Sequence, residues 1–95
     1  MQSVSNVDQF TADLIRDGFE VQTRTIPADT FNDSHAHPFE VRALVIEGGL
    51  NLACNGVGRD YAVGDIFTMA AGMPHVERFG AAQTTYVVGR KQLAA

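Results

Sequence analysis

The chain has 95 residues, of which 45% are hydrophobic and 19% are charged, and its formal net charge is −4. This composition is typical of one small folded domain and excludes an intrinsically disordered chain. The sequence shows no basic patch, no signal-peptide pattern and no apolar run near the roughly 20 residues that cross a bilayer, so we expect a cytoplasmic protein without nucleic-acid or membrane partners.

The first residues predict one short amphipathic helix from Asn6. Val7, Phe10 and Leu14 recur at three- and four-residue intervals, which places them on one helical face. Gly18 is a typical residue for ending a helix. Because so short a helix is marginally stable alone, we expect it to pack as a lid on the main body of the protein.

From Phe19 onward the chain reads as short β-strands separated by turn residues. Alternation and β-branched residues predict strands over residues 20–26, 40–47, 50–54, 61–63, 66–69, 75–79 and 84–88. Asn55-Gly56 is a strong hairpin signal. Residues 28–34 are predicted to form a polar turn, and Arg90-Lys91 are predicted to follow the last strand and lead into a short C-terminal tail. Seven or eight short strands predict an all-β barrel or sandwich. The expected organisation is a helical segment at 1–18, a β-barrel at 19–91 and a tail at 92–95.

Apolar residues of these strands are predicted to fill the core or a subunit contact, and some can line a pocket. They are Phe39, Leu44, Ile46, Leu50, Leu52, Ile66, Phe67, Met69, Phe79 and Tyr86. The single cysteine, Cys54, alternates with Leu50 and Leu52 and is predicted to be a small core residue. So small a barrel leaves strand edges and apolar surface to cover, so we expect a homodimer.

Two of the three histidines, His35 and His37, stand one residue apart at the end of a predicted strand. Side chains repeat every two residues along a strand, so these imidazoles share one face at a spacing of about 7 Å. The third, His75, lies near the C-terminus. If the barrel brings the segments together, three neutral imidazoles can bind one divalent transition metal, either Fe, Mn, Ni, Zn or Cu. The alternative for His35 and His37 is two polar residues near a strand end.

Glu77 lies two residues after His75 and is expected to face the same way, into the barrel. One interpretation is a catalytic acid or base near the metal. The other is a charge at the barrel rim, paired with Arg42 or Arg90. We take Glu77 as the candidate catalytic residue.

In its strand pattern and in the spacing of its histidines, the chain resembles the cupins, a superfamily of small antiparallel jelly-roll β-barrels. The first cupin motif has two histidines separated by one residue, then a glutamate and a closing glycine. Here it reads His35-Ala36-His37-Pro38-Phe39-Glu40 and later Gly48. The second motif reads Gly64, five residues, Ala70-Ala71-Gly72, Met73-Pro74, His75, three residues, Phe79. The resemblance implies a small single-domain cupin with an RmlC-like barrel, a metal inside it, and a homodimer.

The chain departs from these motifs at four positions. Asp29, Ala70 and Phe79 stand where the family has glycine, proline and asparagine, and none of these is a ligand position. The glutamate is the larger departure, because only two residues separate Glu40 from His37 where the family has three or four. The resemblance implies that the carboxylate ligand is either supplied by Glu40 through a tighter hairpin or lost.

The resemblance leaves several functions open, because cupins include oxygenases, isomerases, decarboxylases, sugar-binding domains and sensors. Our first hypothesis is a small metal-dependent enzyme, of oxygenase or isomerase type, acting on a small organic molecule. Glu77 or Glu40 would move a proton. The alternative is a non-catalytic module that binds or senses a small molecule. A third hypothesis is a stable barrel that keeps its metal without chemistry.

Overall fold

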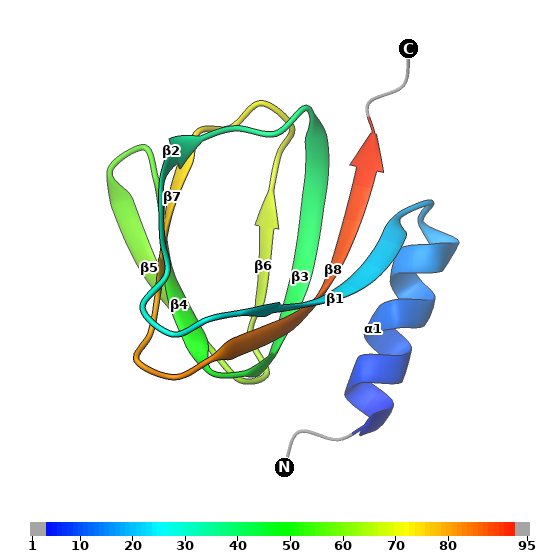
Figure 1. Cartoon of the computed structure of the whole chain (residues 1–95). Helices are drawn as coiled ribbons and strands as arrows, with labels where there is room; N and C mark the ends of the chain where they lie inside the picture. The colour runs from blue at the N-terminus through cyan, green and yellow to red at the C-terminus, as the bar shows by residue number, and fades with distance from the viewer. Residues whose placement is uncertain (1–3, 93–95) are drawn as a thin grey trace.

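The computed structural model describes residues 4–92, with side chains from residue 6 onward. Figure 1 shows the strands wrapped into a barrel with the helix lying outside it. The elements are α1 (Val4–Arg16), β1 (Glu20–Ile26), β2 (Phe31–His35), β3 (Phe39–Glu47), β4 (Gly49–Cys54), β5 (Val57–Ala62), β6 (Ile66–Met69), β7 (His75–Phe79) and β8 (Thr84–Gln92). Within residues 4–92, no helix is long and apolar enough to cross a membrane.

The strands form two antiparallel four-stranded sheets, in the orders β1-β8-β3-β6 and β2-β7-β4-β5. The chain alternates between the sheets from β1 to β4, so strands that follow each other in sequence come to face each other across the barrel. This is the arrangement of a double-sheet jelly roll. The predicted all-β antiparallel barrel with one short N-terminal helix is confirmed.

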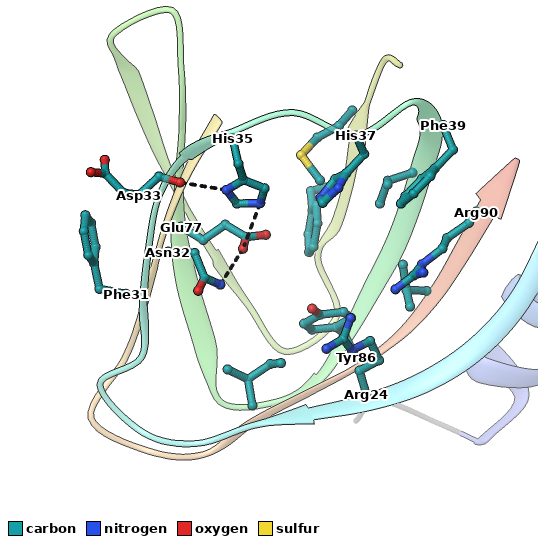
Figure 2. Close-up of a pocket in the computed structure, with 15 residues that line it drawn as sticks. Arg24, Phe31, Asn32, Asp33, His35, His37, Phe39, Glu77, Tyr86 and Arg90 are labelled. Atoms are coloured by element: carbon teal, nitrogen blue, oxygen red, sulfur yellow. Dashed lines mark hydrogen bonds and ion pairs between the residues drawn. The ribbon is translucent and has the colours of Figure 1, made fainter. Parts of the chain in front are cut away.

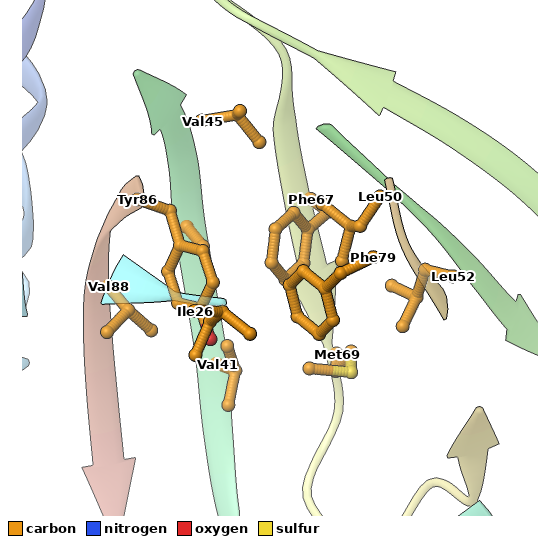
Figure 3. Packing of buried hydrophobic residues seen from close by; sticks show 11 residues of the cluster. Ile26, Val41, Val45, Leu50, Leu52, Phe67, Met69, Phe79, Tyr86 and Val88 are labelled. Carbon is orange, nitrogen blue, oxygen red and sulfur yellow. The ribbon is translucent and has the colours of Figure 1, made fainter. Parts of the chain in front are cut away.

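Buried apolar side chains from both sheets form the core between them, as Figure 3 shows. Val45 and Tyr86 come from one sheet, and Leu52 and Phe79 from the other. Fully burying one side chain of this kind stabilises a fold by about 1.5–3 kcal/mol. Cys54 packs at the edge of this core, as predicted.

A second cluster fixes α1 against the outer face of the first sheet. Phe10 and Leu14 of the helix pack with Leu44 of β3 and Val87 of β8, so these two strands are buried on both faces. The predicted lid is therefore present, although the helix begins at Val4 and not at Asn6. Its end is as expected: Gly18 has a φ of 87°, a left-handed conformation that glycine adopts at low cost.

Some segments differ from the sequence prediction. β2 occupies part of the expected polar turn. It is an edge strand and almost wholly exposed, so its sequence lacks the alternation of apolar and polar residues by which a strand is predicted. β8 continues through Arg90-Lys91 to Gln92, because β3 pairs with it along this whole stretch. Ile66, predicted to be in the core or a subunit contact, is not in the core: it is 51% exposed, since Phe67 and Met69 take the inward positions of β6, and a subunit contact stays a prediction.

Candidate metal centre and its pocket

The two histidine-bearing segments meet where β2 pairs with β7. His35 lies directly opposite His75 in the antiparallel register. The loop that carries His37 is tied to the loop before β7, because the Gly72 amide donates a hydrogen bond to the His37 carbonyl at 2.8 Å. The barrel thus brings together histidines from distant parts of the chain, as the sequence argument required.

The three imidazoles form one compact cluster. The ring centroids of His35 and His75 are 4.2 Å apart, those of His35 and His37 are 4.9 Å apart, and those of His37 and His75 are 5.1 Å apart. One nitrogen from each ring lies within 4.8 Å of the corresponding nitrogens of the other two. Metal–nitrogen bonds are about 2.0–2.1 Å long, so a single ion can bridge the three after a small adjustment of the rings.

Backbone carbonyls determine which imidazole nitrogens face the cluster. The Nδ1 of His35 is 2.7 Å from the Asp33 carbonyl oxygen, and the Nδ1 of His75 is 3.0 Å from the Met73 carbonyl oxygen. A carbonyl can only accept, so each Nδ1 carries the proton and each Nε2 presents a lone pair. The Nε2 of His75 is buried and has no hydrogen-bond partner within the described part of the chain. A buried, unpartnered lone pair beside two other imidazoles fits a metal ligand.

His37 is held by a flat stack on Phe39, with ring centroids 4.8 Å apart and an interplanar angle of 8°. Burial lowers the pKa of His37, and the neighbouring His35 and His75 lower it further. The imidazole is therefore neutral at neutral pH, which is the state that donates a lone pair to a cation.

Glu77 lies beside the cluster, in the interior position expected for it, and is only 8% exposed. Its two carboxylate oxygens are each 3.9 Å from an Nε2 atom, one from that of His35 and the other from that of His75. Asn32 holds the carboxylate by donating a hydrogen bond of 2.9 Å to Oε1 (Figure 2). The alternative ion pairs of Glu77 do not form among residues 4–92, since Arg42 bonds Asp17 instead and Arg90 pairs with no acid.

The structure does not bring Glu40 to the histidines. Phe39 and Val41, its neighbours on β3, line the pocket, and side chains alternate along a strand, so Glu40 points to the opposite face of the sheet. The described residues that could hold a metal together are the three histidines, without Glu40. A hairpin tight enough to turn Glu40 inward does not form, because β3 stays in regular register with β8 across this residue.

A pocket of about 470 Å³ opens beside the cluster. Figure 2 shows His35, Asn32 and Glu77 on one side of it and Tyr86 with two arginines on another. Sequence reasoning missed Arg24 and Asn32, considered Arg90 only as an ion-pair partner of Glu77, and placed Tyr86 among the residues expected in the core or a subunit contact, some of which can line a pocket. The inward direction of Arg24 was available as a signal, because it lies two residues before Ile26, which is buried.

Comparisons with known proteins identify the fold. No protein-family model matches the chain, and no curated protein matches it in sequence. The cupin domain of Schizosaccharomyces pombe Cnp3 matches with a TM-score of 0.71 at 10% identity, covering 79% of this chain and 56% of that one. An RmlC-like cupin from Shewanella frigidimarina matches with a TM-score of 0.62 at 18% identity, covering 76% of this chain and 67% of that one.

The chain therefore has the fold of a small cupin, and its three histidines form a cluster that fits metal binding. It is also similar to the DMSP lyase DddQ from Ruegeria pomeroyi, with a TM-score of 0.68 at 23% identity. That match covers 83% of this chain but only 41% of the lyase. Identities this low establish the common fold, so the activity has to be argued from the site itself.

Proposed function

We propose that this protein is a small metal-binding cupin that acts as a metal-dependent enzyme, of oxygenase or isomerase type, on a small organic molecule. His35, His37 and His75 would hold one divalent transition metal. The observation that carries the proposal is the buried Nε2 of His75, which has no partner among residues 4–92 and lies beside two further imidazoles. Such a metal, when bound, supplies Lewis-acid chemistry, or redox chemistry where the ion is redox-active.

The protein's own contribution to the reaction would come from Glu77. Its carboxylate faces the pocket and is oriented by the amide of Asn32, so it can accept a proton from a substrate atom near the histidines and return it.

The test is to load the metal-free protein with Fe, Mn, Ni, Zn and Cu ions in turn and to follow turnover and oxygen uptake across a panel of small metabolites. We expect one bound ion per chain and turnover with at least one ion. Glu77→Gln should keep the metal and lose turnover. Saturable binding without turnover would instead favour a sensing module, and absence of metal binding would refute the proposal.

Metal occupancy is expected to fall as the pH drops through about 6 to 5, because each ligand must be neutral and protons compete with the metal. His37, whose pKa is lowered by burial and by its neighbours, should stay neutral to a lower pH than an exposed imidazole would. Equilibrium dialysis against zinc between neutral pH and pH 5 measures the occupancy. Occupancy that stays constant over this range would contradict histidine ligation.

We also propose that the protein is a homodimer. Edge strands β5 and β6 each expose an apolar side chain, Val57 at 62% and Ile66 at 51%, and pairing of subunits is a common way to cover such edges. Sedimentation at micromolar concentration should show a species of twice the chain mass. A single species of 10.3 kDa would count against the dimer.

A further inference from the structure

The pocket beside the histidine cluster is lined by two arginines that form no ion pair with the acidic residues described in the structure, although Asp33 and Glu77 line the same pocket. Arg24 on β1 and Arg90 on β8 both line it, and neither forms an ion pair within residues 4–92. By contrast, Arg16 and Arg42 on the outside of the barrel are paired with aspartates. A guanidinium presents several N–H donors in a planar fork that matches a carboxylate, so an unpaired one on a pocket wall is a binding group for an anion.

The strand register places the two arginines on the same wall as a tyrosine. Arg24 is the direct partner of Tyr86 across β1 and β8, and Arg90 lies four residues beyond Tyr86 on the same face of β8. Figure 2 shows the three side chains near one another, on the far side of the pocket from His35, with the Tyr86 hydroxyl pointing into the pocket. The wall therefore combines two cations with a hydroxyl group.

The Tyr86 hydroxyl is suited to donate a hydrogen bond to an anion. Burial raises the pKa of Tyr86, and the negative charge of Glu77 raises it further, while Arg24 and Arg90 act in the opposite direction without reversing the shift. The phenol is therefore protonated at neutral pH.

Arg90 is held in place by a stack that leads to the metal centre. Its guanidinium carbon lies 5.1 Å from the centroid of the Phe39 ring, and Phe39 stacks in turn on His37. A cation over an aromatic face is stabilised by the ring, so the guanidinium is oriented before any ligand arrives. The arginine end and the histidine end thus belong to one continuous wall.

The same pocket also has apolar lining residues. Val41, Phe67 and Met69 contribute side chains there, all of them from the core cluster. A volume of about 470 Å³ is within the usual range for small-molecule sites. The protein as a whole carries a net charge of −4, so the unpaired cations of the pocket are a local feature and do not reflect a generally basic surface.

We propose that the pocket binds a small organic carboxylate, whose carboxylate group is held by Arg24 and Arg90 with the Tyr86 hydroxyl as a further donor. The apolar body of the molecule lies against Val41 and Met69, and its other end reaches the histidine cluster. This inference rests on the proposed function, for which it names the substrate class.

The experiment titrates the zinc-loaded full chain with benzoate and with benzamide, which has nearly the same shape and no charge. Benzoate should bind in the millimolar range or tighter, and benzamide at least about 10-fold more weakly. Arg24→Gln and Arg90→Gln should each weaken benzoate binding about 10-fold, and the double variant should abolish it. Arg59→Gln, which removes an exposed arginine of β5 outside the pocket, is the matched control and should bind benzoate like the unchanged protein.

Metal content is measured in parallel and should be the same in all these variants, so that loss of an anion site is not confused with loss of the metal. Arginine-dependent benzoate binding by a protein that takes up no metal would refute the metal centre and support the anion site. Four results would overturn the inference: equal binding of benzamide and benzoate, benzoate binding that survives in the double arginine variant, no benzoate binding at millimolar concentration, or binding of phenylphosphonate but not of benzoate.

Discussion

The substitution His37→Ala should remove the metal from the protein while leaving the barrel folded. His37 is one of three proposed ligands, and two imidazoles without a third hold a divalent ion far more weakly, by more than about 100-fold. Its side chain is partly exposed and lies outside the core cluster, so the apolar core is unaffected. Elemental analysis after dialysis, together with far-ultraviolet circular dichroism, measures both effects.

His75→Ala should have the same effect on metal content, with a larger effect on stability because His75 is only 2% exposed. The matched control is Glu40→Ala, which removes a carboxylate that points away from the cluster and should retain a full complement of metal. If both histidine variants keep one ion per chain, these residues are not the ligands. If Glu40→Ala loses the ion instead, the Glu40 carboxylate is a metal ligand, and β3 must adopt a different orientation in solution that brings Glu40 to the histidines.

Much of the fold could be predicted from the sequence because its signals are local. Asn55 has a φ of 53° and Gly56 one of 77°, which is the left-handed pair that an Asn-Gly hairpin requires. β6 shows the alternation of buried and exposed residues on which strand prediction depends. The histidines could be placed together because a two-residue spacing puts His35 and His37 on one face, and the second motif put His75 opposite them.

The remaining features depend on contacts that the sequence does not display. β2 is polar and exposed and is a strand only because β7 offers it a partner. Arg90 was placed after the last predicted strand, which ended at residue 88, yet pairing with β3 extends β8 past it. As a result, the anion-binding side of the pocket could not be foreseen, whereas the histidine side could.

The substitution Gly48→Ala should destabilise the protein far more than Gly56→Ala, although both glycines have nearly the same left-handed backbone. Their φ angles are 72° and 77°, so each substitution carries a conformational cost of about 1–2 kcal/mol. Only Gly48 is also confined: a Cβ there would lie 2.4 Å from the Gln83 carbonyl oxygen and 2.9 Å from the Thr84 Cα, whereas nothing lies within 4 Å at Gly56. These neighbours are backbone atoms, so they cannot move aside without shifting the strand.

The crowding at Gly48 occurs where the chain passes from β3 in one sheet to β4 in the other. Thr84, fully buried at the start of β8, donates its hydroxyl to the Gly49 carbonyl at 2.9 Å and accepts from the Gly49 amide at 3.1 Å. A methyl group at position 48 would displace this junction between the sheets, so we expect a loss of about 3–5 kcal/mol in the free energy of unfolding, against about 1–2 kcal/mol for Gly56→Ala. Urea denaturation of the two variants and the unchanged protein measures the difference. Equal losses in the free energy of unfolding would show that the backbone around Thr84 shifts easily to accommodate a methyl group, and that the left-handed conformation alone explains the requirement for glycine at position 48.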